Sequence, residues 1–340
     1  MKMPHRFLKP VRYPNAFFLP YKNQTLNMKS ITYLPILLLL LFAFNCAGQE
    51  KPVSKNIGKE EFPGEMVEFV PYDKNPIFKG TGMDTWDKQI RERGYILHEK
   101  GIYKMWYTGY NGGDTTIKYL GYATSKDGIN WERYSQKPVF HEKWTEDMCV
   151  IKKDGRYYMF AEGRNDVAHS LVSDDGIKWK EEGDLKIYSA DGKSIPGPYG
   201  TPTVWKENGK WYLFYERNDE AIWLAESKDH KTWTNVQDEP VIKTGPEKYD
   251  SGAVAANQVV KYRGRYYLYY HASADPMLSS TMWTSNVAMS TDLIHWIKYP
   301  KNPIVPGDHS SPILVFDGKK YRLYTMHDQV FLYFSKQGKY

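Results

Sequence analysis

Short apolar runs separated by polar turn residues recur along most of the chain. Four of these runs are rich in aromatic residues and follow a turn that contains glycine: KGIYKMWYTG, DGRYYMFAEG, NGKWYLFYER and RGRYYLYYHA. Apolar runs of this length, bounded by turn residues, predict β-strands, and two strands joined by a tight glycine turn predict a hairpin. The chain is therefore predicted to be all-β and built from antiparallel hairpins.

A second phrase, Ser-x-Asp-x-x-x-Trp, follows the hairpins and fixes the length of the repeat. Its copies are Ser125–Trp131, Ser173–Trp179, Ser227–Trp233 and Ser290–Trp296, with the Trp residues 48, 54 and 63 residues apart. Each repeat then contains two hairpin strands, a third strand, the Asp turn and an outer strand beginning at Trp. Four antiparallel strands in a repeat of this length predict a propeller blade. We expect the Asp turn and the Trp to be architectural, since turn chemistry and packing explain both.

A fifth repeat, SSPILVFDGKKYRLYTMHDQVFLYFSK, supplies three strands before the chain ends. The segment Lys74–Phe78 resembles Lys301–Val305, which closes the fourth repeat. We expect this N-terminal segment to provide the missing strand of the last blade, because it would close the ring and remove an open sheet edge. The sequence thus predicts a five-bladed β-propeller over residues 62–340, with the N-terminal strand closing the last blade.

Composition and charge narrow the classes of partner. The 340 residues are 41% hydrophobic and 16% aromatic, which suits a large core and a surface that stacks on flat ligands. Six of the 46 Lys and Arg residues and no acidic residue lie in the first 45 positions, which leaves 40 basic against 40 acidic residues. A polyanion-binding domain carries a basic stripe, so nucleic acid is not an expected partner.

The N-terminal region predicts export. Met28 is the expected true start, with residues 1–27 as a mis-called extension and residues 28–46 as a signal peptide. The apolar run Ile36–Phe44 leads into Ala43–Cys46, which resembles a bacterial lipobox with Cys46 as the lipidated residue. Residues 47–61 are expected to be a linker. We expect an outer-membrane or periplasmic lipoprotein of a Gram-negative bacterium, bound to membrane only through that anchor, with plain secretion as the alternative.

The remaining cysteine, Cys149, has no partner for a disulfide if Cys46 is lipidated, and is expected to be a small buried residue. The chain contains no Gly-x-Ser-x-Gly elbow, which argues against an α/β-hydrolase. The glycine-rich stretch YNGGD lacks the Lys-Ser/Thr pair of a phosphate-binding loop. These motifs give no sign of a nucleotide or of a serine nucleophile.

Candidate chemistry appears when the repeats are aligned on the glycine of their first hairpin turn. This alignment puts one pair from each repeat at the start of its first strand: Glu92–Arg93, Glu146–Asp147, Gly200–Thr201, Ala255–Ala256 and His309–Ser310. The second strands return to the same end of the propeller, so Glu162 and Glu216 are expected nearby. Paired carboxylates across a concavity can act as the acid and the base of glycoside hydrolysis. Ion pairs of Glu162 with Arg164 and of Glu216 with Arg217 are the alternative interpretation.

The blade phrases GIYKMWYTGY, GYATSKDGINWERY and NGKWYLFYERND resemble the five-bladed glycosidases of the arabinanase, β-xylosidase, levansucrase and invertase group. The resemblance covers roughly Phe62–Tyr340. It implies an exo-acting glycoside hydrolase, working on a plant or algal oligosaccharide through three carboxylates in a central funnel. The base or nucleophile would be Glu92, with Asp87 as a rival, and Glu146–Asp147 would match the stabilising acid. The chain departs from the group at the third acid, for which Glu216 or Asp250 would have to substitute.

Other residues complete the predicted site. We expect aromatic side chains near the funnel rim to stack on sugar faces, and basic ones to suit a carboxylated or sulfated sugar: Trp86, Trp144 and Tyr199, then Arg91, Arg93 and Arg164. His271 and His309 are candidates for proton transfer or substrate binding, with filling of the funnel or contact with a structural Ca²⁺ or Na⁺ as alternatives. No cofactor is required for this chemistry, and a monomer is expected.

Two other functions stay open. A carbohydrate-binding lipoprotein without turnover would keep the aromatic rim but lack two opposed acids. A sialidase-like enzyme is suggested by the Asp-box-like turn, but that fold has six blades and needs three arginines and a tyrosine nucleophile. Only five repeats are present.

Overall fold

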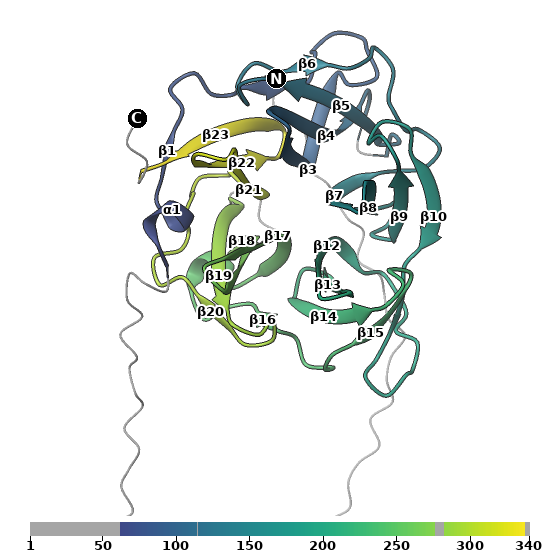
Figure 1. The fold of residues 1–340 in the computed structure, drawn as a ribbon, viewed down its shortest axis with the longest axis vertical. Coiled ribbons are helices and arrows are strands. Elements are labelled where there is room, and N and C mark those ends of the chain that lie inside the picture. Colours follow the sequence, from purple (N-terminus) through teal and green to yellow (C-terminus); the bar gives the residue numbers. More distant parts are fainter. Residues whose placement is uncertain (1–61, 114, 276–281, 337–340) are drawn as a thin grey trace, which may run out of the picture. The chain divides into compact units, whose positions relative to one another are not determined.

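The computed structural model describes residues 62–113, 115–275 and 282–336, which form a ring of five small, mostly antiparallel sheets (Figure 1). This is the predicted five-bladed β-propeller. The predictions for residues 1–61, including the signal peptide, Cys46 and the linker, lie outside the described residues. Among the described residues, no helix has the length and apolar character needed to cross a membrane.

Each of the first four blades follows the predicted order of strands, from the axis outward. Blade 1 contains β3 (Gln89–Glu99), β4 (Ile102–Tyr110), β5 (Tyr119–Ser125) and β6 (Glu132–Arg133). Blade 2 contains β7 (Glu146–Lys153), β8 (Arg156–Glu162), β9 (Ala168–Ser173) and β10 (Lys180–Asp184). Blade 3 contains β12 (Gly200–Glu207), β13 (Lys210–Glu216), β14 (Ala221–Ser227) and β15 (Thr232–Asn235), with β11 (Lys186–Tyr188) and β16 (Ile242–Lys243) added at its outer edge. Blade 4 contains β17 (Ala253–Tyr262), β18 (Arg265–Ser273), β19 (Thr284–Ser290) and β20 (Trp296–Lys298), preceded by the 3₁₀ turn η1 (Lys248–Asp250).

The last blade is closed by the N-terminal part of the propeller, as predicted. Its own strands are β21 (Pro312–Phe316), β22 (Tyr321–Met326) and β23 (Gln329–Ser335). The outer strand is β1 (Phe69–Pro71), which follows the short helix α1 (Gly64–Val67) and pairs antiparallel with β23. The expected segment Lys74–Phe78 lies just after β1 and leads into β2 (Phe78–Lys79), which pairs with the other end of β23. The Asn75 side-chain amide donates to the Leu332 carbonyl and accepts the Leu332 N–H, so this segment also contributes to the closure.

The repeated Asp turn is stabilised by its own side chains. Ser125 Oγ accepts the Gly128 N–H at 2.9 Å, and Asp127 Oδ1 accepts the Ile129 and Asn130 N–H groups at 2.8 Å. The same bonds recur at Ser173, Ser227 and Ser290. The architectural interpretation of the phrase is therefore consistent with its contacts.

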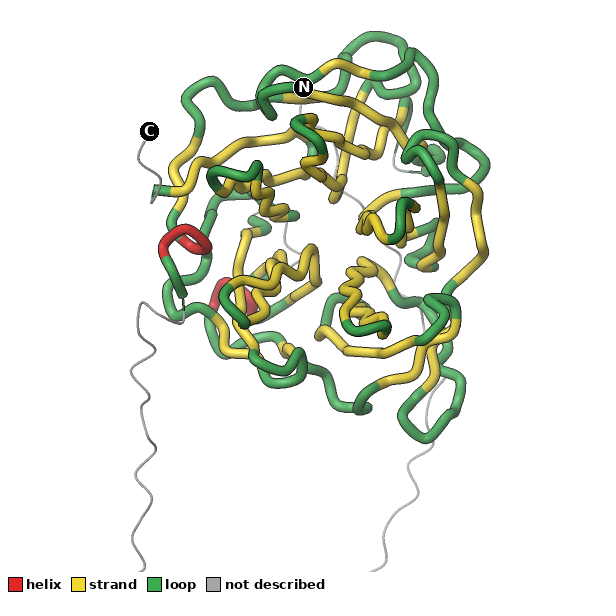
Figure 2. The backbone as a smooth tube through the Cα atoms, in the orientation of Figure 1, coloured by secondary structure: helices red, strands yellow, loops and turns green. Residues whose placement is uncertain are grey.

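Large aromatic side chains join two of the blades to the Asp turn of the next one. Trp106 of blade 1 donates to the Gly176 carbonyl of blade 2 at 2.7 Å, and Tyr324 of blade 5 donates to the Gly128 carbonyl of blade 1 at 3.1 Å. Cys149 is fully buried, as expected. The inner strands lie in the middle of the ring, and the loops between blades lie at its rim and ends (Figure 2).

Candidate active site

The inner strands are bulged where they begin, and the bulges turn acidic side chains toward the axis. Register shifts interrupt β3 between Arg91 and Tyr95, β7 between Glu146 and Cys149, and β12 between Gly200 and Thr203. Within them, Glu92, Asp147 and Thr201 have φ values of 54°, 47° and 47°, a left-handed conformation that costs energy for non-glycine residues. Strained backbone of this kind concentrates at functional sites.

Blades 4 and 5 differ from the sequence alignment. In β17 the shift falls at Asn257, between Ala256 and Gln258, and in blade 5 the left-handed residue is Ser311 with a φ of 58°. The pairs Ala255–Ala256 and His309–Ser310, which the sequence alignment put at the ring positions, therefore lie one or two residues before Asn257 and Ser311, respectively. The reason is that the bulges contain different numbers of residues, so the distance from the hairpin glycine is not constant.

Six acids meet at this end of the axis, and we call them the axial acid cluster: Glu92, Glu146, Asp147, Glu162, Glu216 and Asp219. The exposed fractions of Glu146, Asp147, Glu162 and Glu216 are only 5%, 7%, 8% and 5%. Gly200 shows how closely two of the acids approach, because a methyl group added there would lie 2.2 Å from Glu216 Oε1 and 2.5 Å from Glu162 Oε2. The structure thus brings together Glu92, Asp147, Glu162 and Glu216, which the sequence had singled out.

The pKa values of the acids in this cluster are shifted in different directions. Burial favours the neutral form of Glu92, but Arg91, His327 and His271 outweigh it and lower the pKa of Glu92 to about 2. Burial and the nearby Glu92 charge raise the pKa of Asp147 well above its usual value. Burial also raises the pKa of Glu146 to about 7 and, with Asp219, that of Glu216 to about 8. The pKa of Glu92 is therefore displaced downward and the pKa values of its neighbours upward, which is how environments separate an acid from a base.

Arg91 orients the acids on the side of blades 1 and 2. Its guanidinium forms an ion pair with Glu92 and lies 3.2 Å from Glu146 Oε2 through Nε. Trp144 donates its indole N–H to the other oxygen of Glu146 at 2.7 Å. Both Arg91 and Trp144 were expected to touch substrate, and in the structure each contacts an acid directly.

Arg93 lies on the axis with an exposed fraction of zero. Its Nη1 donates to Thr203 Oγ1 and to the Ala256 carbonyl, both at 2.7 Å, and its Nη2 donates to the carbonyls of Asp147 and Pro202. These acceptors belong to blades 2, 3 and 4. Arg93 therefore joins four blades through their bulges, and its guanidinium faces the protein interior instead of a ligand.

Sequence reasoning missed Asp219, although a signal was present. Glu162 and Glu216 are each followed closely by the triplet Arg-Asn-Asp, at 164–166 and 217–219. Both Asn-Asp pairs have positive φ and form the hairpin turn, and the Asp219 N–H donates to Glu216 Oε2 at 2.6 Å. Burial and Asp166 raise the pKa of Asp219 to about 6.

The arginines of these triplets contact aromatic rings. Arg164 lies over Trp144 and Arg217 over Trp223, with 5.9 Å and 5.6 Å from guanidinium carbon to ring centroid. No ion pair joins either arginine to Glu162 or Glu216 in the part of the chain that the structure describes. The ion-pair interpretation of the two glutamates is therefore not what the structure contains.

Imidazoles occupy the side of blades 4 and 5. Asn257 Nδ2 lies 3.0 Å from His271 Nδ1, and Ser310 Oγ lies 3.0 Å from His327 Nδ1. Burial and Arg93 lower the pKa of His271 to about 3, so its ring is neutral. His309 packs its ring against Phe331, and burial lowers its pKa as well. No group of three or more His, Cys, Asp or Glu side chains among the described residues is arranged to hold a metal ion.

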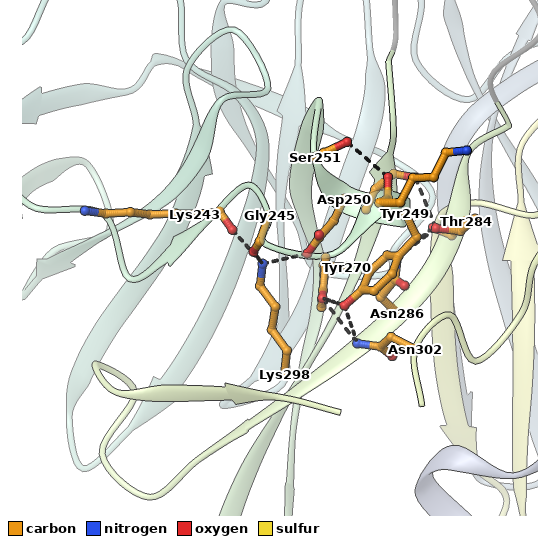
Figure 3. Close-up of polar contacts among 12 residues, drawn as sticks. Lys243, Gly245, Tyr249, Asp250, Ser251, Tyr270, Thr284, Asn286, Lys298 and Asn302 are labelled. Atoms are coloured by element: carbon orange, nitrogen blue, oxygen red, sulfur yellow. Dashed lines mark hydrogen bonds and ion pairs between the residues drawn. The ribbon is translucent and has the colours of Figure 1, made fainter. Parts of the chain in front are cut away.

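Two predicted acids lie apart from the cluster. Asp87 is buried beside the outer strand of blade 1, where its carboxylate accepts from Arg133 Nε at 2.6 Å and from the Tyr107 hydroxyl at 3.1 Å. Asp250 ends η1, and its carboxylate lies 2.6 Å from the ammonium of Lys298 on the outer strand β20 (Figure 3). Lys298 also donates to the carbonyls of Lys243 and Gly245, so this network connects the edges of blades 3 and 4.

The remaining aromatic candidates are packed against protein. Trp86 stacks on Tyr107 with 5.8 Å between ring centroids and covers Gly109. Tyr199 is 9% exposed, and its hydroxyl donates to the Leu185 carbonyl at 3.0 Å. Tyr199 is therefore buried, whereas Trp86 is partly exposed and its contact with a sugar stays a prediction.

Comparisons with known proteins agree with the fold and point to one group of enzymes. No family model matches the chain. It is 26% identical over 223 residues to a 1,2-β-oligomannan phosphorylase of Thermoanaerobacter sp. (strain X514), which covers 62% of this chain and 73% of that protein. A putative glycosidase from Bacteroides thetaiotaomicron VPI-5482 superimposes with a TM-score of 0.63 at 18% identity, covering 82% of this chain and 99% of the other.

A further structure with a TM-score of 0.63, at 16% identity over 81% of this chain and 95% of the other, comes from the GH130 family of mannoside phosphorylases. That family is described as containing glycoside hydrolases that target β-1,2-mannosidic linkages in Candida mannan. The chain therefore has the fold of the five-bladed propellers that include glycoside hydrolases. Several of the similar proteins are named as mannoside phosphorylases or come from that family, and the arabinanase and invertase group is not specifically indicated.

Proposed function

We propose that this protein is a carbohydrate-active enzyme that cleaves the terminal glycosidic bond of an oligosaccharide by hydrolysis at the axial acid cluster. The observation that carries the proposal is the pair formed by Glu92 and Asp147, whose pKa values are displaced in opposite directions at neighbouring bulges. A carboxylate that stays ionised next to a carboxylic acid that stays protonated is the apparatus of acid/base glycoside cleavage. Asp147 would protonate the leaving oxygen, and Glu92 would serve as base or nucleophile.

Glu216 and Glu146 have supporting roles in this proposal. Glu216, at the end of β13 in blade 3, has a pKa raised to about 8 and would substitute for the third carboxylate that the ring positions of blades 3 and 4 lack. Glu146 is held by Arg91 and by the Trp144 indole, which would keep the Arg91 guanidinium in place beside Glu92.

The proposed substrate is a β-1,2-linked mannoside, since two relatives are named as phosphorylases of such mannosides. Plant and algal oligosaccharides, the substrates expected from sequence, form the comparison set. Attack by water is favoured over attack by phosphate because both axial arginines are engaged: Arg91 by two carboxylates and Arg93 by backbone and hydroxyl oxygens. A dianionic phosphate bound at the axis would need cations there that are not neutralised in this way.

Phosphorolysis is the second candidate because two relatives are named as phosphorylases. One experiment separates the candidates. The protein is incubated with β-1,2-mannobiose with and without inorganic phosphate, and mannose and mannose 1-phosphate are quantified. Hydrolysis gives only mannose in both conditions, whereas phosphorolysis gives the sugar phosphate and depends on phosphate.

The Asp147→Asn variant tests the site, with Asp174→Asn as its matched control on an exposed turn. We expect at least a hundredfold loss of turnover for Asp147→Asn and none for the control, since general acid catalysis contributes factors of about 10² to 10⁴. Binding of oligosaccharides without turnover across the whole panel would instead support the carbohydrate-binding alternative.

Export and lipidation at Cys46 belong to the same proposal. Mass spectrometry of the mature protein from a Gram-negative host would detect a lipidated Cys46 at the new N-terminus. A soluble periplasmic product cleaved elsewhere would favour plain secretion.

A further inference from the structure

A cavity of about 320 Å³ lies beside the axial acid cluster, between the first and the last blade. The loop Lys79–Gly82 forms one wall, and Lys88–Ile90 at the beginning of β3 forms another. Tyr110, at the end of β4, and Asp328–Gln329, between β22 and β23, complete it. The volume is at the lower end of the range for small-molecule sites, about 300 to 1,000 Å³.

The walls of this cavity have the chemistry that binds a sugar. The residues that line it include two glutamines, Gln89 and Gln329, two lysines and one aspartate, Asp328. Neither Lys79 nor Lys88 takes part in an ion pair within the described ranges. Ile90 and Tyr110 add apolar surface at 5% and 9% exposure. Several directed polar groups beside a small apolar area suit a neutral hydroxyl-rich ring better than an apolar or strongly charged ligand.

Two sets of contacts place the cavity next to the axial acid cluster. On one wall, the Tyr110 ring lies 3.8 Å from the Lys118 ammonium, which lies 4.9 Å from the ring of Trp144, and the Trp144 indole donates to Glu146. On the opposite wall, Asp328 directly follows His327, whose Nδ1 lies 3.0 Å from Ser310 Oγ beside the bulge of blade 5. Gln89 belongs to the same strand as Glu92 and lies three positions before it. The cavity therefore adjoins the cluster at Glu92, outward from the axis.

We propose that this cavity receives the second sugar of the oligosaccharide, the leaving unit, while the terminal sugar lies against the axial acid cluster. This assignment rests on the proposed function, because it takes the bond between the two sugars to lie over Glu92 and Asp147. It makes Gln89 and Gln329 specificity residues that contact the leaving sugar and not the terminal one. The protein is then selective for a sugar as leaving group.

Binding measurements decide the assignment without requiring turnover. Isothermal titration of β-1,2-mannobiose and of mannose into Asp147→Asn is compared with the same titrations into Asp147→Asn combined with Gln89→Leu or Gln329→Leu. The leucine keeps the volume of the side chain and removes its polar end. We expect the Kd for mannobiose to rise about tenfold, equivalent to about 1.4 kcal/mol, and the Kd for mannose to stay within twofold.

Gln237→Leu, in the loop after β15, is the matched control and should change neither Kd. Equal weakening of both ligands, no weakening of mannobiose, or no binding of mannobiose would overturn the assignment. Turnover of mannobiose by the unmodified protein is recorded in parallel. Absence of turnover together with selective weakening would refute the proposed function and leave the second-sugar site standing.

Discussion

Replacing Glu216 with glutamine should stabilise the protein, and the gain should grow with pH. Glu216 is 5% exposed, and its pKa is raised from 4.5 to about 8 by burial and by Asp219. In the unfolded chain the carboxyl ionises near pH 4.5, whereas in the folded protein it keeps its proton until about pH 8. The stability that the protonated form provides is thus fully present below pH 4.5 and is lost as pH rises through the folded pKa.

The size of the effect follows from the same displacement. A pKa difference of this size corresponds to about 5 kcal/mol at about 1.4 kcal/mol for each pH unit. Because neighbouring acids titrate together with Glu216, the gain from one substitution is smaller, and we expect about 2 kcal/mol or more at pH 8.5. A glutamine can still accept the Asp219 N–H, so this hydrogen bond does not offset the gain.

Urea unfolding followed by tryptophan fluorescence, at pH 5 and at pH 8.5, measures both stabilities. Equal m-values would show that the unfolded state is unchanged. The matched control is Glu207→Gln, where Lys261 and Tyr266 lower the pKa and the substitution should cost up to about 1 kcal/mol at pH 8.5. A difference for Glu216→Gln that is independent of pH, or that shrinks toward pH 8.5, would refute the claim that this acid is held protonated.

Three further substitutions test other parts of the structure. Arg91→Met should lower the unfolding free energy by about 3 kcal/mol at pH 7, since Arg91 is the ion-pair partner that lowers the pKa of Glu92 to about 2. Because this low pKa stabilises the folded state above about pH 4.5, the loss should shrink in urea titrations as pH falls from 4.5 toward 2. Gly200→Ala should abolish turnover of β-1,2-mannobiose, because the added methyl group would displace the carboxylates of Glu162 and Glu216, while circular dichroism should show that the protein stays folded. Asp127→Ala should cost about 1 to 2 kcal/mol in thermal unfolding and leave kcat unchanged, because it removes only turn hydrogen bonds.

The fold could be predicted because its signals are local. Ser125 and Asp127 satisfy backbone N–H groups within five residues, so the turn and its Trp can be recognised without any distant contact. Once the repeat was fixed, the number of blades and the closure by an N-terminal strand followed. What could not be predicted was that β1, at Phe69–Pro71, makes most of the closing contact, since both candidate segments lie next to β23.

The site was harder to predict because bulges break the alternation of strand residues. In a regular strand Arg93 and Arg91 would point to the same face, yet the bulge sends Arg93 into the interior and leaves Arg91 with the acids. Asp250 looked equivalent to a blade acid because it precedes an inner strand. Only the three-dimensional structure shows its carboxylate on Lys298 at the rim.

The energetic cost of the cluster is itself an argument about function. Arg93 is the one fully buried arginine among the described residues, and its Nη1 and Nη2 donate to carbonyl and hydroxyl oxygens and not to the carboxylates around it. Burial therefore raises the pKa values of Glu146 and Glu216 to about 7 and 8, near the working pH of an enzyme. A site that only binds sugar hydroxyls would be served as well by asparagine or glutamine, without this penalty at neutral pH. Acids that exchange protons at that pH are what cleavage of a glycosidic bond requires, so the destabilising carboxylates favour turnover over binding alone.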